Sequence, residues 1–173
     1  NISYGLDYSE RLIKAERVDE AKDILKRIIS KVPTSKLAYQ KLGKVSWETD
    51  DLDEAASAYE SLFKIDPRDG RVAISISDIY IDSENYGKAL RWADKSINLI
   101  DNNGNGYGQK GKVYYKAWES LKNNPLSVDD RIVAKLAYDN FTKAEKMSYR
   151  GFNRLKYLKE NSKDLLYGKA QWF

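Results

Sequence analysis

Residues 101–112, with the sequence DNNGNGYGQKGK, combine residue types that occur in three kinds of ligand-binding loop. Four of them match the start of a calcium-binding EF-hand loop: Asp101, Asn103, Asn105 and Gly106. Three glycines and a lysine have the spacings of dinucleotide and nucleotide phosphate loops: Gly106, Gly108, Gly111 and Lys112. The first kind of loop would give oxygen ligands to Ca²⁺, and the other two would bind phosphate through backbone N–H groups.

Each of these loops lacks something that its chemistry needs. The twelfth position of an EF-hand loop is a Glu that gives two oxygens to the cation, but here it is Lys112. A phosphate loop needs a preceding strand, and the nucleotide type also needs Ser or Thr after the lysine, where this chain has Val113. Residues 89–100 instead have the apolar spacing of a helix. No cofactor and no metal is therefore expected.

An ordinary turn between two helices explains most of this segment. We expect residues 101–106 to connect two helices, with Asn and Gly supplying the positive φ of a helix C-cap. We expect Gly111 to lie in the next helix, where it allows close packing. Gly108 would stand in the first turn of that helix, either at a frayed start or where the backbone of a partner comes close.

The composition argues against catalysis. The chain of 173 residues has no Cys and no His, so it lacks the thiolate nucleophile, the usual general base and the commonest transition-metal ligand. The adjacent carboxylates at 50–51 and 129–130 lie at expected helix starts, where they complement the helix dipole. We therefore expect a protein that is not an enzyme.

The sequence leaves the compartment of the protein open. No apolar run approaches the roughly 20 residues of a transmembrane helix, so we expect a soluble protein without membrane insertion. The chain begins at Asn1, which we interpret as a processed or excised end, so cytoplasmic and periplasmic or extracytoplasmic locations both stay open. The formal net charge of +4 is only a weak indication of an anionic partner.

The sequence has a regular repeat period of about 34 residues. It is clearest at the evenly spaced Ala21, Ala55 and Ala89, and Pro33 and Pro67 are separated by the same interval. A second series precedes these alanines in each unit: Tyr39, Leu42 and Gly43; Ala73, Ile76 and Ser77; Tyr107, Lys110 and Gly111. Both series have the i, i+3, i+4 spacing of amphipathic helices, so each unit is expected to be a pair of helices.

This pattern resembles the tetratricopeptide repeat (TPR) family, whose unit has the same length, and most closely at Tyr39, Leu42, Gly43, Ala55, Tyr59 and Pro67. The resemblance implies an all-α, right-handed superhelix, an α-solenoid of about four helix-turn-helix repeats with a C-terminal capping helix. We expect one domain over residues 1–173, with repeats at about 2–34, 36–68, 70–102 and 104–147 and a cap at 149–173.

The fourth unit departs from the period. Ala137 takes the role of the earlier alanines, whereas the period would place that role at Asn123. We expect elongated helices, with about two turns added to each. Ser127 and Asp130 should form a capping box at the start of the second helix. Phe152, Leu155 and Leu158 predict a final helix that covers the end of the stack.

The resemblance also implies that the first helices line a concave groove that holds a peptide or a helix of a partner. Carried over to this sequence, the groove residues are Leu6, Glu10, Ile13, Leu37, Lys41, Lys44, Trp47, Arg71, Ile74, Asp78, Ile81, Gln109, Lys112 and Tyr115. One column recurs with the repeat period and is apolar or aromatic: Ile13, Trp47, Ile81 and Tyr115. This column is either a binding stripe for apolar anchors or a packing surface for neighbouring helices or the chain's own tail.

The expected function is a protein-interaction or assembly scaffold whose protein or peptide partner and oligomeric state the sequence does not identify. Some TPR proteins hold chaperone C-termini with a clamp of Lys, Asn and Arg side chains. We do not expect this clamp here, because its residues are missing whether it is taken to start at the first repeat or at the second. The alternative is a helical-repeat module that binds nucleic acid. It is disfavoured, because acidic residues interrupt the basic ones on the same face.

Overall fold

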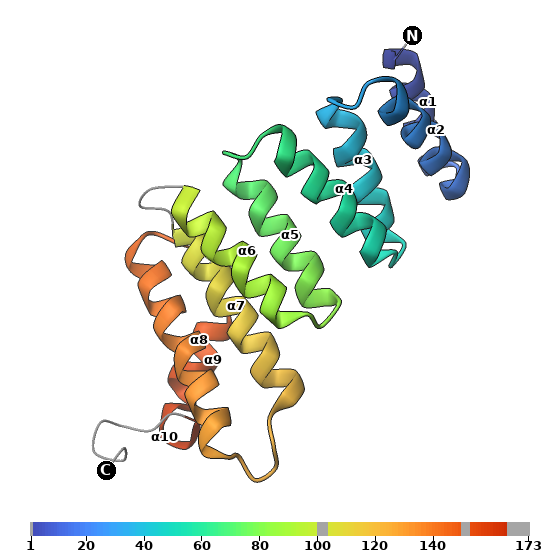
Figure 1. Cartoon of the computed structure of the whole chain (residues 1–173). Coiled ribbons are helices and arrows are strands. Elements are labelled where there is room, and N and C mark those ends of the chain that lie inside the picture. Colours follow the sequence, from blue (N-terminus) through green and yellow to red (C-terminus); the bar gives the residue numbers. More distant parts are fainter. Residues whose placement is uncertain (1, 100–103, 150–152, 166–173) are drawn as a thin grey trace.

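The computed structural model describes residues 2–99, 104–149 and 153–165, and all regular structure in these ranges is helical (Figure 1). The helices are α1 (Ile2–Lys14), α2 (Val18–Lys31), α3 (Lys36–Glu48), α4 (Leu52–Ile65), α5 (Gly70–Asp82), α6 (Tyr86–Leu99), α7 (Gly104–Leu121), α8 (Val128–Lys146), α9 (Asn153–Glu160) and α10 (Ser162–Leu165). Several positions named above lie outside the described residues: Asp101, Asn103, Phe152 and residues 166–173.

The helices follow the repeat period closely. The first helices α1, α3, α5 and α7 begin at residues 2, 36, 70 and 104, and the second helices α2, α4 and α6 begin at residues 18, 52 and 86. Successive helices pack against each other, so that helix hairpins stack into one elongated array (Figure 1). The expected all-α array of helix hairpins is confirmed, whereas the proposed bounds of the repeats stay a prediction.

Small residues on the first helices set the close approach within each hairpin. Ser9, Gly43, Ser77 and Gly111 stand at the same position of successive repeats, and all four are buried. A Cβ on Gly43 would lie 2.6 Å from the Tyr59 ring. The hydroxyl of Ser77 instead donates a hydrogen bond to the carbonyl of Ala89, at 2.9 Å. A larger side chain at this position would push the two helices apart.

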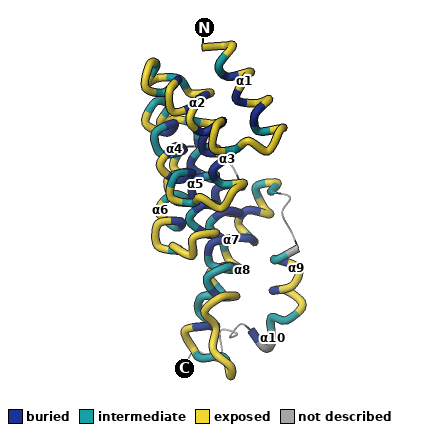
Figure 2. Tube along the Cα trace, turned by 90° about the vertical axis from the view of Figure 1, so that its right-hand side faces the viewer, coloured by how far each residue is buried: buried dark blue, intermediate teal, exposed yellow. Residues whose placement is uncertain are grey.

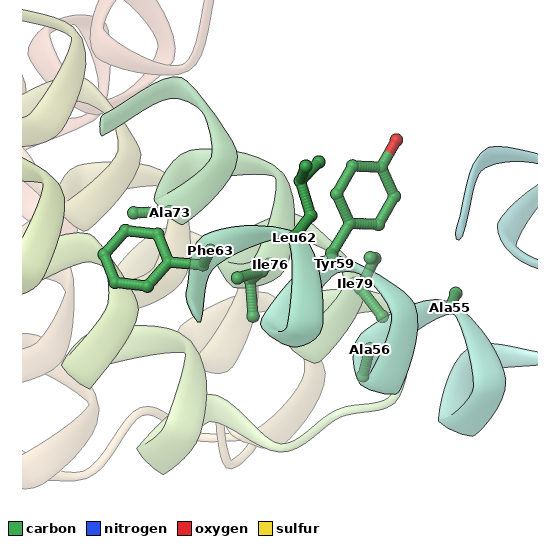
Figure 3. Packing of buried hydrophobic residues seen from close by; sticks show 8 residues of the cluster. All are labelled: Ala55, Ala56, Tyr59, Leu62, Phe63, Ala73, Ile76 and Ile79. Carbon is green, nitrogen blue, oxygen red and sulfur yellow. The ribbon is translucent and has the colours of Figure 1, made fainter. Parts of the chain in front are cut away.

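The apolar faces of neighbouring hairpins close over one another. Figure 3 shows one such cluster, which is formed by side chains of α4 and α5. It consists of Ala55, Ala56, Tyr59, Leu62, Phe63, Ala73, Ile76 and Ile79. Because no single hairpin can bury such a face alone, the array is stable only as a stack.

The tight turns inside the first three hairpins are built without glycine. Glu16, Asp50 and Glu84 have φ of 60°, 61° and 55°, and Ser148 after α8 has φ of 62°. At each of the first three turns the next N–H bonds to the carbonyl five residues earlier, for example Asp51 to Ser46 at 2.8 Å. This is the Schellman arrangement of a helix end. The sequence did not indicate it, because these residues are not the glycines that usually adopt this conformation.

The assignment of residues 101–106 to a turn is wrong at Gly104, Asn105 and Gly106, which belong to α7. No glycine among the described residues has a positive φ. Gly104 and Gly106 are small because helices meet there: a Cβ would lie 2.7 Å from the Ala144 carbonyl oxygen in the first case and from the Ile97 side chain in the second. The helix also removes the loop that the calcium and phosphate motifs require.

Gly108 has a packing role, and neither explanation offered by the sequence holds. It is buried in α7, and a Cβ there would lie 2.5 Å from the ring of Tyr149, which follows α8. The chain's own tyrosine, not a partner, therefore comes close at this point. Gly111 faces Phe141 of α8 in the same way, as expected for a close-packing glycine.

The fourth hairpin is longer, but less than expected. α7 has 18 residues and α8 has 19, whereas α5 and α6 have 13 and 14. The gain is thus about one and a half turns per helix, not two, because part of the insertion forms a longer connection at residues 122–127. The capping box of Ser127 and Asp130 is confirmed.

Within the described residues, two short helices and not one follow the fourth hairpin. α9 ends at Glu160, and α10 follows it at residues 162–165. Leu155 and Leu158 of α9 are buried with Trp118 of α7 and Phe141 of α8. The segment therefore covers apolar surface at the C-terminal end of the array.

One ion-pair cluster joins the first two hairpins. The ammonium of Lys22, a buried residue of α2, lies 2.9 Å from the Asp51 carboxylate and 3.0 Å from that of Glu54. Burial alone would raise the pKa of Glu54, but hydrogen bonds from Lys26, Lys22 and Ser46 lower it from 4.5 to about 2. The charged form of Glu54 therefore stabilises the folded chain.

We expect Gly111→Ala to lower the free energy of unfolding by about 1–3 kcal/mol, because the new Cβ would lie 2.8 Å from the buried Phe141 ring. Gly87→Ala is the matched control, since a Cβ there meets nothing within 4 Å. It should leave stability unchanged or raise it by up to about 1 kcal/mol. Urea denaturation followed by circular dichroism measures both, and equal effects would contradict this packing role.

We expect acid to weaken the chain through Glu54. Its pKa is lower in the folded state, so its contribution is complete above about pH 4.5 and is lost as the pH falls toward 2. Wild type should lose about 2–3 kcal/mol more over this range than Glu54→Gln. Urea denaturation at each pH gives these values. Glu160→Gln, which removes an exposed carboxylate of α9, is the matched control substitution.

Candidate interaction groove

The expected groove residues fall into three classes of exposure. Leu6, Ile81 and Gln109 are buried. Ile13, Lys41, Trp47, Ile74, Asp78, Lys112 and Tyr115 are half-buried. The freely exposed ones are Glu10, Leu37, Lys44 and Arg71. The surface open to a partner is thus smaller than the sequence suggests.

Polar residues of this face join successive first helices. Lys41 of α3 donates to Glu10 of α1 in an ion pair. Trp47 of α3 donates its indole N–H to Asp82 of α5 at 2.7 Å. Asp78 of α5 accepts hydrogen bonds of 2.6 Å from both Gln109 and Lys112 of α7. These side chains hold the helices side by side.

Two of the four apolar and aromatic residues in this column, Ile81 and Tyr115, pack against neighbouring parts of the molecule. Ile81 is 6% exposed and lies in a cluster with Ala89, Ala93 and Val113. Tyr115 contacts Trp118 and also Tyr157 of α9, with the latter rings perpendicular and 6.3 Å apart. At these two positions the contacts match the packing interpretation. The side chains pack against neighbouring helices and, at Tyr115, against the C-terminal segment formed by α9 and α10.

The C-terminal segment lies on the side of the first helices. Figure 2 shows α9 beside the α7–α8 hairpin, on the side of the array where α1 and α3 also lie. Burial raises the pKa of the Tyr115 phenol, with a smaller contribution from Glu119, as expected for a ring partly enclosed by neighbours. The open part of the groove is therefore the part formed by α1, α3 and α5.

A pocket of about 210 Å³ lies on this open part, between α1 and α3. Its lining is Glu10, Ile13, Lys14, Lys41, Lys44, Val45 and Glu48. Two branched apolar side chains, Ile13 and Val45, are surrounded by charges of both signs. The volume is below the roughly 300–1,000 Å³ of drug-sized ligand sites, so the pocket fits a single side chain.

Sequence reasoning missed three of these lining residues: Lys14, Val45 and Glu48. A signal was present, because Lys14 and Glu48 stand four residues after Glu10 and Lys44 on the same helix faces. The repeat pattern assigned only one groove residue per helical turn on each first helix. Val45 was hidden by its other role, since it belongs to the packed cluster between α2 and α3.

A second hollow of about 240 Å³ lies where α7 passes the turn between α5 and α6. It is lined by Ile81, Asp82, Glu84, Tyr86, Lys116, Glu119 and Ser120. Lys116 and Glu119 pair with each other across 2.6 Å, so this hollow offers few groups for a ligand.

Metal chemistry and membrane insertion find no support in the described part of the chain. Within these residues there is no group of three or more His, Cys, Asp or Glu side chains that could hold a metal ion. The helices found there are also too short or too polar to cross a membrane.

Residues 37–69, which span α3, α4 and the segment after them, match the sequence profile of the tetratricopeptide repeat. The chain contains a TPR. The matched segment is the unit that resembles the TPR pattern most closely in sequence, with Gly43 against Tyr59 as its tight contact. No curated protein matches the sequence.

The helix array is similar in structure to MamA. MamA from Desulfovibrio magneticus RS-1 is 13% identical, with 94% of this chain and 86% of that chain covered and a TM-score of 0.69. A second MamA crystal structure is 17% identical, with 97% of this chain and 79% of that chain covered and a TM-score of 0.66. At this identity the likeness establishes a shared fold.

Two substitutions should distinguish groove residues that stabilise the fold from groove residues that are exposed and available to a partner. Asp78→Ala removes the acceptor of two hydrogen bonds to α7 and leaves Lys112 without its carboxylate, so we expect a loss of about 1–3 kcal/mol in unfolding free energy. Lys44→Ala should change it by less than about 0.5 kcal/mol, because that side chain is 69% exposed. Thermal and urea denaturation measure the difference, and similar losses would contradict the distinction.

Proposed function

We propose that this chain is a protein-interaction scaffold that holds a segment of a partner protein against α1, α3 and α5. An apolar side chain of the partner enters the pocket between α1 and α3. Stacked helix repeats form extended surfaces of this kind, and such surfaces are what repeat proteins use for binding. The division into repeats at about 2–34, 36–68, 70–102 and 104–147, with a cap from 149, belongs to the same proposal.

The pocket between α1 and α3 is the observation that carries this proposal. It has an apolar floor, a charged rim and the volume of one side chain. Interfaces of this type place an anchor residue in a central pocket and polar groups around it. Leu37 is 47% exposed on α3 and offers a second apolar contact for the bound segment.

The rim favours a partner that carries negative charge next to its anchor. Glu10 is already paired with Lys41. Lys44 lies 3.7 Å from Glu48, but both side chains of this ion pair are highly exposed. Such a pair contributes little to stability. Among the described residues no carboxylate lies within ion-pair distance of Lys14. Lys14 and Lys44 are therefore the cations that a partner carboxylate would reach.

Catalysis and nucleic-acid binding are not part of the proposal. The titratable groups of the groove serve as links between helices, as in the pairs Glu10–Lys41 and Asp78–Lys112. A nucleic-acid surface needs a continuous basic stripe, and Asp78 and Asp82 interrupt the cations of this face.

Peptide selection tests the proposal. Peptides selected from a random library on the purified chain should carry an apolar residue next to Asp or Glu. Lys44→Glu and Lys14→Glu should each lower the affinity for a selected peptide by about 10-fold, as measured by fluorescence anisotropy. Each substitution replaces an attractive charge by a repulsive one. Lys64→Glu, the same charge change at an exposed position on α4, is the matched control and should bind like wild type. Peptides that bind all variants equally would show that the groove is not the binding site.

A further inference from the structure

The stacking faces of the inner repeats have a common composition. Ala38, Leu42 and Val45 of α3 and Ala58 of α4 form one such face, with exposed fractions of 0%, 6%, 2% and 4%. They are buried in one cluster with Leu25 and Ile28 of the preceding helix α2. On α5, Ile76 and Ile79 occupy the same positions as Leu42 and Val45 and are fully buried against α4.

The same four positions of the first hairpin, one repeat period earlier, are Tyr4, Tyr8, Arg11 and Ile24. We call these residues the α1 end face. The α1–α2 hairpin is at one end of the array, and in the described part of the chain no helix precedes it (Figure 1). Tyr4 is therefore 70% exposed and Tyr8 38% exposed, Arg11 is exposed, and Ile24 is half-buried.

The residue types of the α1 end face differ from those of an ordinary solvent-exposed surface. The rings of Tyr4 and Tyr8 are parallel and stacked, with centroids 6.4 Å apart. Tyr and Arg are enriched at the centre of protein interfaces and among the residues that dominate binding energy, whereas Lys and Glu are depleted there. A face composed of two Tyr, one Arg and one Ile has the composition of an interface.

Three basic side chains also lie on this face or beside it. Arg11 stands where Val45 and Ile79 are buried in the later repeats. Arg27 and Lys31 line a pocket of about 180 Å³ beside Ile24, together with Ile2, Gly5 and Ile28. Among the described residues none of these three cations has a carboxylate within ion-pair distance. A helix that covers Arg11 must therefore bring its own carboxylate, because a buried unpaired charge is very costly.

We propose that the α1 end face binds an amphipathic helix of a partner protein. The contacting side of that helix has small residues such as Ala, and its flanks carry Asp or Glu. The face continues the stacking interface by which α2 covers α3 and α4 covers α5. Tyr4 and Tyr8 replace Ala38 and Leu42, so the space left for the covering helix is smaller and requires small side chains.

An acidic residue near the face, Asp7, sets the orientation of the bound helix. Asp7 stands one repeat period before Lys41, which reaches back along the groove to Glu10. It thus faces the groove edge, while Arg27 and Lys31 lie on the α2 side. The carboxylates of the partner helix are placed over α2, away from Asp7.

This surface is separate from the groove. The groove pocket uses Glu10, Ile13 and Lys14 of α1, whereas the end face uses Tyr4, Tyr8 and Arg11 on another side of the same helix. A partner in the groove and a helix on the α1 end face can therefore be bound together, and either proposal can fail without the other.

The test uses two designed helical peptides of about 18 residues, a length at which isolated helices form measurably. Both have an Ala stripe, one flanked by Glu and the other by Lys. Titrated into the ¹⁵N-labelled chain, the Glu peptide should shift the amide signals of Tyr4, Tyr8, Arg11 and Ile24. In fluorescence anisotropy it should bind at least about 10-fold more tightly than the Lys peptide at low salt.

Three variants make the result decisive. Arg11→Glu should reverse the preference between the two peptides, and Tyr8→Ser should weaken the Glu peptide by about 10-fold, since Tyr is a frequent interface anchor. Lys64→Glu on α4 is the matched control and should bind both peptides like wild type. Circular dichroism checks the folding of each variant, whose substituted residues are all exposed.

Other outcomes would overturn the proposal. Equal binding of the two peptides, no binding of either, or shifts confined to the groove residues would show that the α1 end face does not take an acidic helix. Self-association in light scattering that Tyr8→Ser abolishes would show that a second copy of the chain, not a partner helix, occupies the face.

Discussion

The close contact between a small residue on α3, α5 and α7 and a side chain or backbone group of the following second helix is the constraint on which this array depends. Gly43 meets Tyr59, Ser77 bonds to the carbonyl of Ala89, and Gly111 meets Phe141. The contact fixes the distance between the two helices and thereby the orientation of their remaining faces. Those faces then stack on the next hairpin, and a regular repetition of one contact produces the elongated shape.

Stacking also decides which residues remain for binding. Polar side chains on the groove side link one first helix to the next, as Asp78 does with Gln109 and Lys112, so much of the charge there is structural. The C-terminal segment takes Tyr115, and Ile81 lies in the core between repeats. Among the described residues, two places that remain are the small pocket between α1 and α3 and the α1 end face. Both are places where the regular stacking leaves apolar groups without a complete neighbour.

The fourth hairpin shows how an insertion is accommodated. Its two helices are each lengthened by more than one turn, and a longer connection takes up the rest. The alanines at 134, 137 and 144 are buried, and the added residues lie near the connection between α7 and α8. Four glycines in α7 would weaken an isolated helix, so tertiary contacts with Ile97, Phe141 and Tyr149 must hold it.

The sequence by itself determined the period, the two helices per unit, the longer fourth hairpin and the capping box of Ser127, because these depend on the spacing of apolar and small residues along the chain. Tertiary structure alone decided which candidate groove residues are exposed and why Gly108 is a glycine. The partner of Gly108 is Tyr149, which lies beyond the whole of α8, and Glu16, Asp50 and Glu84 adopt positive φ only because the packed hairpin imposes the turn. Spacing specifies the face on which a residue lies, whereas its exposure depends on which distant segment packs against that face.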